Sequence, residues 1–109
     1  LIMGFTFKEH FPDIRNTKII EIIKILNAYN IKLDIVDPWV DSQLAFESYG
    51  INVKNKFMEG KSYSAVLCAL AHKQFLELKD ENWRSLINQG GILFDLKGLI
   101  PRQLNPIRI

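Results

Sequence analysis

Short apolar runs alternate with amphipathic segments along the chain. Two of the runs are apolar on both faces, residues 1–7 (LIMGFTF) and 64–70 (SAVLCAL), which is typical of parallel strands covered by helices. A third run alternates apolar and polar positions over residues 31–36 (IKLDIV) and predicts a strand nearer the sheet edge. A last strand is predicted over residues 92–96 (ILFDL). Gly4, inside the first run, indicates a close approach of another segment of backbone.

The segments between these runs have helical spacing. Isoleucine and leucine recur every three or four positions over residues 19–26, and this pattern predicts an amphipathic helix whose apolar stripe includes Ile25. A second helix is predicted shortly after the second strand, where Asp41 or Ser42 can cap its start and Gly50 can end it.

Two short helical pieces are predicted after the 64–70 run. The first is centred on Phe75 and the second on Trp83, with Asp80 as the helix cap between them. A turn is predicted at residues 89–91 (QGG), just before the last strand.

The order strand, helix, strand, helix, strand, helix, strand predicts an α/β domain. We expect a Rossmann-like arrangement of three layers, in which a mostly parallel sheet carries helices on both faces. A length of 109 residues corresponds to a single domain covering residues 1–109. Because the chain begins at Leu1 within an apolar run, we expect this domain to be excised from a longer protein.

Composition excludes several classes of function. The net charge of +2 arises from 14 basic and 12 acidic residues in a mixed pattern, so a nucleic-acid partner is not expected. No apolar run approaches the roughly 20 residues that span a membrane. The single cysteine cannot form an intrachain disulfide, which favours a reducing compartment and a cytoplasmic protein.

The residues that most often carry chemistry show no catalytic or metal-binding spacing. Cys68 lies mid-strand among apolar residues and is expected to be a small hydrophobe instead of a nucleophile. His72 follows the central strand and can cap the next helix or line a cleft, whereas His10 lies in an exposed loop. These histidines and the cysteine lack the spacing of metal ligands, so no metal site is predicted.

Asp37 ends the second predicted strand, where dinucleotide-binding folds keep a ribose-binding acid. The turn after Phe7 carries no Gly-x-Gly-x-x-Gly, the glycine pattern that lets backbone approach a pyrophosphate. We therefore interpret Asp37 as a turn residue before Pro38, with ribose binding as the alternative.

Three cations lie where strands are predicted to end. Lys8 and Arg15 flank the first strand-to-helix junction, and Lys97 follows the last strand. Helix starts favour anions, and the carboxyl ends of parallel strands share one edge, so these residues can form a phosphate or carboxylate site. The alternative is that Lys8 is solvated and that Arg15 pairs with Asp13 or Glu9.

The beginning of the chain resembles a known family. Residues 4–9 (GFTFKE) and 12–17 (PDIRNT) are similar to the start of the C-terminal domain of nucleotide-sugar 6-dehydrogenases, the UDP-glucose/GDP-mannose dehydrogenase family. Three later segments agree in order and spacing, namely 34–38 (DIVDP), 65–75 with its AHKQF ending, and 94–98 (FDLKG). The resemblance therefore spans nearly the whole chain.

The resemblance implies one domain of a three-domain enzyme. Its N-terminal domain binds NAD, its central helical domain dimerises near a catalytic cysteine, and its C-terminal domain closes over the nucleotide sugar. The enzyme oxidises the sugar C6 alcohol to a carboxylate through a thiohemiacetal and a thioester, a step that serves surface-polysaccharide precursors. Neither that cysteine nor the NAD fingerprint lies in this chain, so we expect no catalytic residue here and no activity of the chain alone. The alternative is a standalone flavodoxin-like nucleotide-binding or regulatory module without catalysis.

Position by position, the resemblance assigns roles to the three cations. Lys8 matches a lysine that reaches the substrate, Arg15 matches an arginine on the NAD side, and Lys97 takes the first position of a substrate-binding pair. Gly98 stands where some UDP-glucose enzymes have an arginine. With Ala71-His72, this makes the chain more similar to members that act on UDP-N-acetylhexosamines. The full-length protein is expected to be a homo-oligomer.

Overall fold

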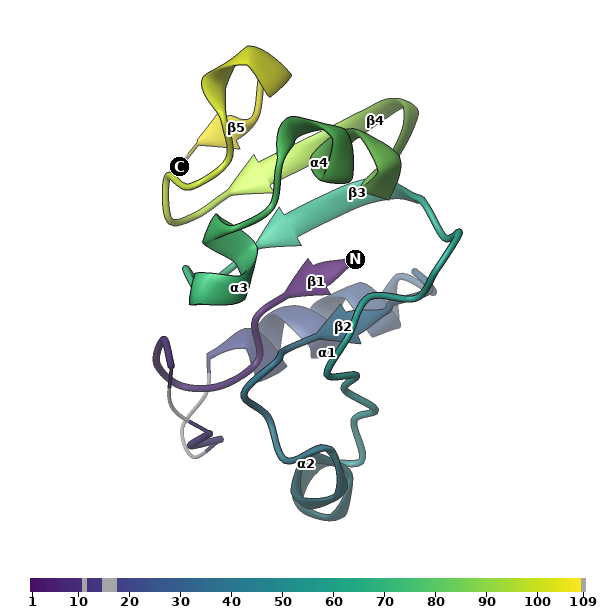
Figure 1. The fold of residues 1–109 in the computed structure, drawn as a ribbon. Helices are drawn as coiled ribbons and strands as arrows, with labels where there is room; N and C mark the ends of the chain where they lie inside the picture. The colour runs from purple at the N-terminus through teal and green to yellow at the C-terminus, as the bar shows by residue number, and fades with distance from the viewer. Residues whose placement is uncertain (11, 15–17, 109) are drawn as a thin grey trace.

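A parallel sheet with strand order β2-β1-β3-β4-β5 runs through the middle of the molecule (Figure 1). The structure is a computed structural model, and it describes residues 1–10, 12–14 and 18–108. Each strand pairing in this part of the chain is parallel, which confirms the predicted α/β class. The direction of winding changes between β1 and β3, the place where open sheets of this type leave a crevice for ligands.

The first and second strands are shorter than the apolar pattern predicted. The strands are β1 (Ile2–Met3), β2 (Ile35–Val36), β3 (Tyr63–Cys68), β4 (Ile87–Asp95) and β5 (Ile107–Arg108). β2 lies at a sheet edge and β3 in the centre, as predicted. β1 ends early because the backbone N–H groups of Phe5 and Thr6 donate to the Asp37 carboxylate and not to a neighbouring strand.

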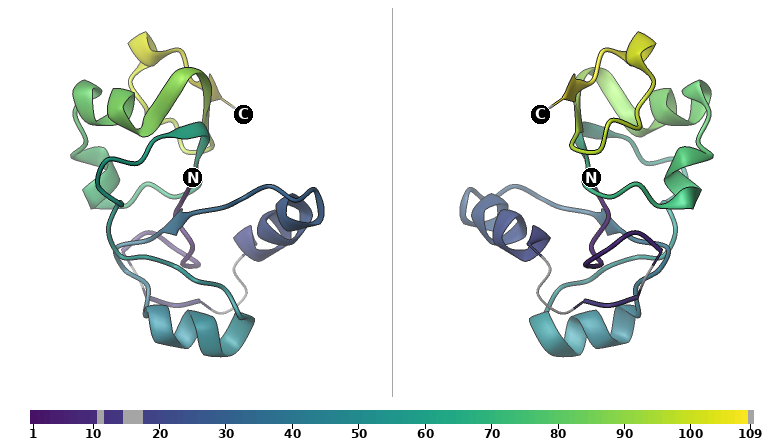
Figure 2. Two further views of the ribbon diagram at one scale, coloured as in Figure 1. Left: turned by 90° about the vertical axis from the view of Figure 1, so that its right-hand side faces the viewer. Right: turned by 90° about the vertical axis from the view of Figure 1, so that its left-hand side faces the viewer.

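Helices cover both faces of the sheet. They are α1 (Ile19–Ala28), α2 (Ser42–Tyr49), α3 (Lys73–Leu76) and α4 (Asp80–Leu86), with a short 3-10 turn at Arg102–Leu104. Figure 2 shows α1 on one side of the sheet and α3 and α4 on the other. Among the described residues, no helix has the length and apolar character needed to cross a membrane.

The first two helices begin and end largely as expected. α1 starts after Lys18, which makes no side-chain cap, and Ile25 is 58% exposed, so its assignment to the buried stripe was wrong. The cap of α2 is confirmed, because Asp41 accepts a hydrogen bond from the Leu44 N–H at 3.1 Å. Gly50 ends this helix in the left-handed conformation that glycine tolerates.

The predicted turn at residues 89–91 is wrong, because β4 continues through it. Tyr63 pairs with Ile87 and Ala65 pairs with Ile92, so the four β4 residues 88–91 lie opposite the single β3 residue Ser64. Gly90 and Gly91 thus lie at an irregularity within the strand and do not reverse the direction of the chain.

Two predictions at the ends of elements were also wrong. Asp80 is the first residue of α4, and Lys79 occupies the cap position. The segment at residues 92–96 was predicted to be the last strand, but β5 follows it and pairs through Ile107 with the end of β4.

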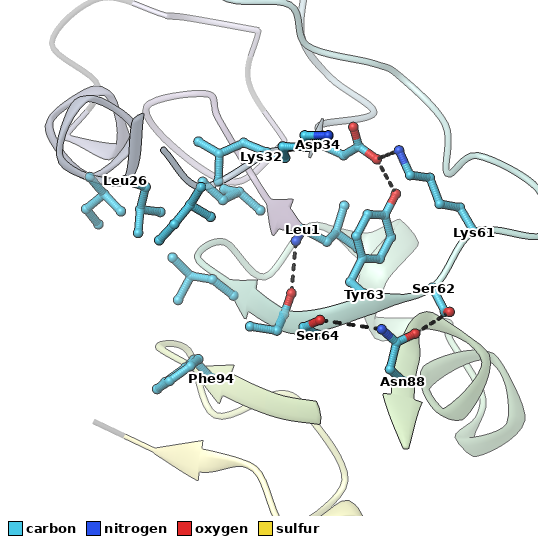
Figure 3. Close-up of a pocket in the computed structure, with 16 residues that line it drawn as sticks. Leu1, Leu26, Lys32, Asp34, Lys61, Ser62, Tyr63, Ser64, Asn88 and Phe94 are labelled. Atoms are coloured by element: carbon cyan, nitrogen blue, oxygen red, sulfur yellow. Dashed lines mark hydrogen bonds and ion pairs between the residues drawn. The ribbon is translucent and has the colours of Figure 1, made fainter. Parts of the chain in front are cut away.

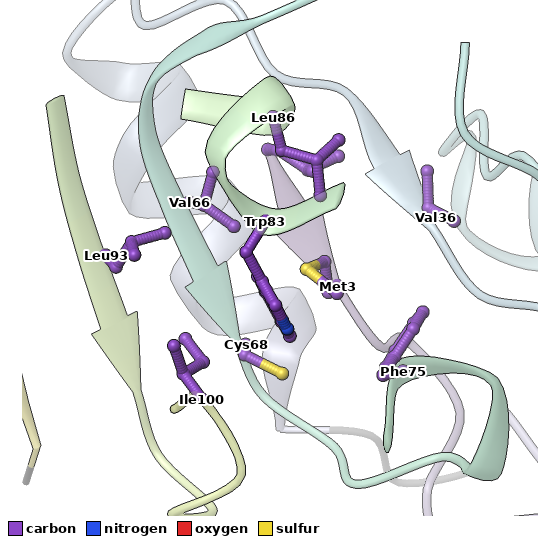
Figure 4. Packing of buried hydrophobic residues seen from close by; sticks show 10 residues of the cluster. Met3, Val36, Val66, Cys68, Phe75, Trp83, Leu86, Leu93 and Ile100 are labelled. Carbon is purple, nitrogen blue, oxygen red and sulfur yellow. The ribbon is translucent and has the colours of Figure 1, made fainter. Parts of the chain in front are cut away.

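Side chains of alternate strand residues pack into two separate hydrophobic cores, one on each face of the sheet. Met3 and Val36 pack toward α3 and α4, whereas their neighbours Ile2 and Ile35 pack toward α1 and α2. Figure 4 shows the first core, where Trp83 of α4, only 1% exposed, lies against the middle of the sheet. This division follows from the two-residue period of a strand and confirms a sheet covered on both faces.

Gly4 makes the predicted close approach. Its φ is +108°, and a Cβ there would lie 2.8 Å from the Leu70 Cβ and 3.0 Å from the Leu70 backbone nitrogen. The chain that leaves β1 therefore presses directly on the chain that leaves β3.

Candidate functional site

The carboxyl ends of the strands bring four connections to one edge of the sheet. They are residues 4–10 after β1, 37–39 after β2, 69–72 after β3 and 96–100 after β4. In Figure 1 the strand arrowheads point to this edge, where the first loop and α3 lie. The connections after β1 and β3 leave toward opposite faces, so this edge contains the topological switch point.

A buried carboxylate joins the first two connections. Asp37 is 0% exposed. Its Oδ2 accepts hydrogen bonds from the Phe5 N–H at 2.7 Å, the Thr6 N–H at 2.8 Å and the Thr6 hydroxyl at 3.0 Å. Its Oδ1 accepts from the Trp39 N–H at 2.8 Å. Both oxygens accept hydrogen bonds from the protein, so neither is available to a ribose. Asp37 therefore does more than shape a turn, because it links the connections after β1 and β2.

These contacts keep Asp37 ionised. Burial alone would raise the pKa of its carboxyl, but the hydrogen bond from His72 and the backbone N–H groups of Thr6 and Phe5 outweigh burial. The pKa of Asp37 therefore lies below its ordinary value, and the group is a charged acceptor at neutral pH.

His72 is the third partner of this carboxylate. Its ring is 0% exposed, and its Nε2 lies 3.0 Å from the Asp37 Oδ2 and 3.2 Å from the Thr6 Oγ1. Its Nδ1 accepts the His10 N–H at 3.1 Å. His72 occupies the cap position of α3, as one alternative held, but its side chain makes no cap bond because it points into the protein.

A second buried carboxylate shapes the loop after β4. Asp95 is 1% exposed, and its Oδ1 accepts the N–H groups of Lys97, Gly98 and Leu99 at 3.2, 2.8 and 3.2 Å. Its Oδ2 accepts the Ile100 N–H at 2.8 Å. The loop is therefore wound around one side chain, which orients Lys97 outward.

An ion pair connects this loop to the loop after β1. The Lys97 Nζ lies 3.4 Å from the Glu9 Oε1, and the Lys97 side chain is 43% exposed. The pKa of Glu9 is lowered, chiefly by its own backbone N–H and against the effect of burial, with the Ala71 N–H and Lys97 contributing. The structure thus pairs Lys97 with the residue that follows Lys8 in the sequence.

The other two cations differ in how far the structure describes them. Lys8 is exposed in the tip of its loop, whose base is closed by the Phe7 N–H donating to the Asp13 carbonyl at 2.7 Å. Arg15 lies outside the described residues, and so does any pairing with Asp13 or Glu9.

Cys68 is a core residue, as predicted. It is 0% exposed, and its thiol lies 3.6 Å from the Leu70 carbonyl. Burial, aided by the charge of Asp95, raises the pKa of the Cys68 thiol to about 12, which disfavours the nucleophilic thiolate. Within residues 1–10, 12–14 and 18–108, no group of three or more His, Cys, Asp or Glu side chains is arranged to hold a metal.

A cavity of about 670 Å³ lies at the opposite edge of the sheet (Figure 3). Leu1 and Leu26 contribute to its apolar wall. On its rim, Asp34 accepts the Tyr63 hydroxyl at 2.7 Å and pairs with the Lys61 Nζ at 2.6 Å. Of the predicted ligand-binding cations that the structure describes, neither Lys8 nor Lys97 lines this cavity.

Comparison with known proteins identifies the family of the chain. A sequence profile described as the UDP-glucose/GDP-mannose dehydrogenase family, UDP binding domain, matches residues 1–102. The chain belongs to this family. The UDP-binding domain is 40% identical over 109 residues to a UDP-N-acetyl-D-glucosamine 6-dehydrogenase of Salmonella typhi, covering 100% of this chain and 25% of that protein. It is 39% identical to the Pseudomonas aeruginosa enzyme of the same name, again over the whole chain and 26% of that protein.

A solved structure supports the same assignment. The UDP-binding domain superposes on the UDP-N-acetyl-mannosamine dehydrogenase Cap5O from Staphylococcus aureus with a TM-score of 0.69 and 25% identity. The match covers 91% of this chain and 22% of that structure. The domain thus spans about a quarter of the length of the curated relatives it matches.

Three side chains that organise the edge of the UDP-binding domain were not predicted as such. Glu9 and Asp95 were treated as ordinary polar positions, and His72 was given a cap or cleft role. The available signal was placement: Asp95 is the last residue of β4, and Glu9 and His72 lie in the connections after β1 and β3, where backbone N–H groups need acceptors. The bonds around Asp37 join residues that are 31 to 66 positions apart in the sequence, and no local pattern reveals such pairs.

Proposed function

We propose that this UDP-binding domain holds the nucleotide sugar in an NAD-dependent UDP-sugar 6-dehydrogenase. In that role the longer protein oxidises the sugar C6 alcohol to a carboxylate, a reaction suited to making surface-polysaccharide precursors. The observation that carries the proposal is the Glu9–Lys97 ion pair, at 3.4 Å, because it joins the loops after β1 and β4 at the switch edge. The family and the names of the relatives point to the same substrate class.

Charge explains why this edge suits a UDP-sugar. The UDP diphosphate is dianionic, and ammonium groups form charge-assisted hydrogen bonds with phosphate oxygens. Lys8 and Lys97 are both exposed cations, and Lys97 pairs with the Glu9 carboxylate, which a diphosphate would displace by competition. We assign both lysines to substrate binding and no residue of this chain to catalysis.

NAD would be bound mainly outside this chain. The residues after β1 do not fit a dinucleotide site, because the Gly4 backbone is packed against Leu70 and the Asp37 carboxylate is consumed internally. When bound, NAD would accept the hydride from the substrate. The domain by itself is expected to be inactive. Arg15 is proposed to contact the NAD side of the closed enzyme.

The sugar is proposed to be a UDP-N-acetylhexosamine. Two relatives carry UDP-N-acetyl-D-glucosamine in their names and the solved neighbour carries UDP-N-acetyl-mannosamine. Gly98 agrees with this choice, because it adds no second cation beside Lys97. An N-terminal NAD domain and a central helical domain of the same polypeptide are the proposed partners, within a homo-oligomer.

The test is a set of kinetic measurements on the full-length protein. UDP-N-acetylglucosamine, UDP-N-acetylmannosamine and UDP-glucose are each supplied with NAD while NADH formation is followed. Lys8→Ala is expected to lower kcat/KM for the preferred sugar by about tenfold to a hundredfold, because a charge-assisted hydrogen bond is worth roughly 1.5–3 kcal/mol.

Lys61→Ala is the matched control, because Lys61 lies at the opposite edge beside the cavity. It is expected to change kcat/KM by less than about twofold, as surface ion pairs contribute little. Unchanged kinetics of Lys8→Ala on every sugar would remove Lys8 from the site, and no NADH with any UDP-sugar would overturn the proposed function.

A further inference from the structure

Two histidines at the switch edge have no role in the binding proposed above. The His72 ring is buried, His10 is exposed, and the ring centroids lie 6.0 Å apart. Each ring accepts a hydrogen bond from backbone. The His10 N–H donates to the His72 Nδ1 at 3.1 Å, and the Lys73 N–H donates to the His10 Nε2 at 2.8 Å. Since a backbone N–H can only donate, both accepting nitrogens are unprotonated.

The direction of these bonds defines a connected series. With Nδ1 of His72 accepting, its Nε2 carries the proton and donates to the Asp37 Oδ2 at 3.0 Å. The series therefore runs from the Lys73 N–H through His10 and His72 to Asp37. It joins the connections that leave β3, β1 and β2, and it uses both nitrogens of the buried ring.

The backbone of His10 is held in a disfavoured conformation by this series. Its φ is 64°, in the left-handed region that residues with a side chain rarely adopt. The backbone N–H of His10 is fixed by His72, and its ring is fixed by Lys73 and lies 5.8 Å from the Trp39 ring between centroids. Strain of this kind persists only where the surroundings impose it, and it concentrates at ligand sites.

We propose that His10 and His72 form a latch that positions the loop of residues 4–10, and with it Lys8, for the nucleotide sugar. The inference rests on the proposed function of that loop. Lys8 lies two residues before His10, so fixing the His10 backbone limits where the Lys8 backbone can lie. His72 is a positioning residue and not a catalytic one, because it is 0% exposed and both of its nitrogens are occupied by protein.

Hydrogen exchange tests the latch without any need for activity. His72→Phe keeps an aromatic ring beside Phe75, whose centroid lies 5.5 Å away, but removes both hydrogen bonds. In the full-length protein, amides of residues 5–10 are expected to exchange about tenfold faster or more in this variant, since their protection comes from local bonds. Leu93→Ala, a buried β4 change in the same core, is the control for general destabilisation and is expected to leave that peptide less affected.

A double-mutant cycle with Lys8→Ala shows whether the latch acts through Lys8. His72→Phe alone is expected to lower kcat/KM for the preferred UDP-sugar about tenfold. Interaction energies between residues of one hydrogen-bond network are commonly of this size. Combined with Lys8→Ala, it should add less than about a twofold further loss, because the residue that it positions is already gone. Leu93→Ala should instead combine additively with Lys8→Ala. His72→Asn places an acceptor near the His10 N–H and is expected to recover part of the activity.

The outcomes separate the latch from the proposed function. Unchanged exchange of residues 5–10 in His72→Phe, or additive losses in the cycle, would overturn the latch while leaving the dehydrogenase assignment intact. A wild-type protein that oxidises no UDP-sugar would overturn the proposed function, and the exchange result would still decide whether the histidines hold the loop. If His72→Phe does not fold, the exchange of His72→Asn compared with His72→Gln decides instead. The Asn amide oxygen can take the position of Nδ1 and accept from the His10 N–H, whereas the Gln amide reaches the position of Nε2, toward Asp37. Equal exchange of residues 5–10 in the two variants would overturn the latch.

Discussion

Replacing Asp37 by alanine is expected to lower the free energy of unfolding by about 3–5 kcal/mol. The change leaves the N–H groups of Phe5, Thr6 and Trp39, and the Nε2–H of His72, without their acceptor. A buried donor that loses its partner costs about 1–3 kcal/mol, and partial relaxation keeps the total below the simple sum. Urea denaturation of the wild-type chain and the variant measures the difference.

Asp41→Ala is the control for this prediction. Asp41 is exposed and caps α2 through a single bond, from the Leu44 N–H at 3.1 Å, so its loss should cost only about 1 kcal/mol. Equal costs for the two variants would contradict the view that Asp37 is the central crosslink of the edge.

Acid is expected to remove the same contribution in the wild-type chain. The pKa of Asp37 is lower in the folded protein than its ordinary value of about 3.9, so near that pH the unfolded chain binds more protons. The stabilisation is therefore present above about pH 4 and is lost as the pH falls through the lower folded pKa. The difference in unfolding free energy between wild type and Asp37→Asn should shrink over that window, and a constant difference would argue against an ionised Asp37.

Asp95→Ala is the second large change, with an expected loss of about 2–4 kcal/mol. The N–H groups of Lys97, Gly98, Leu99 and Ile100 lose their acceptor, but the exposed ones at Lys97 and Gly98 can turn to water. The loop should also lose its shape, so the full-length protein should show a raised KM for its UDP-sugar. Urea denaturation and steady-state kinetics measure the two effects.

Asp95→Asn tests how much of this stabilisation comes from the three hydrogen bonds to Oδ1. The amide oxygen can still accept from Lys97, Gly98 and Leu99, whereas its NH2 group opposes the Ile100 N–H. We expect a loss between those of wild type and alanine. A loss as large as that of alanine would show that the three bonds to Oδ1 are not sufficient to hold the loop.

Periodicity carried the prediction of the fold class a long way. The apolar run at 64–70 became β3 in the centre of the sheet, and the alternating run at 31–36 became an edge strand. The outcome for β3 follows from burial at its carboxyl end, where Val66 and Cys68 are both fully buried. The close approach at Gly4 and the helix end at Gly50 were also predicted correctly, because each of these backbone arrangements excludes most side chains.

Periodicity failed where a distant side chain replaced a backbone partner. The run at 1–7 predicted a long first strand, but Asp37 captures the N–H groups of Phe5 and Thr6 and ends β1 after Met3. The glycines at 90 and 91 predicted a turn but lie within β4, because the pairing with β3 continues on either side of them. Neither result depends on local propensity, so local patterns could not show it.

The parallel α/β class and the family could be predicted from the sequence, because the pattern of apolar residues and the spacing of motifs are local properties of the chain. The resemblance at residues 4–9 and 12–17 also singled out Lys8, whose role remains a prediction. Only the tertiary structure brought Lys97 to Glu9 at 3.4 Å and His72 to Asp37 at 3.0 Å. Those contacts join residues 88 and 35 positions apart, and they arise because parallel strands deliver their carboxyl ends to one edge.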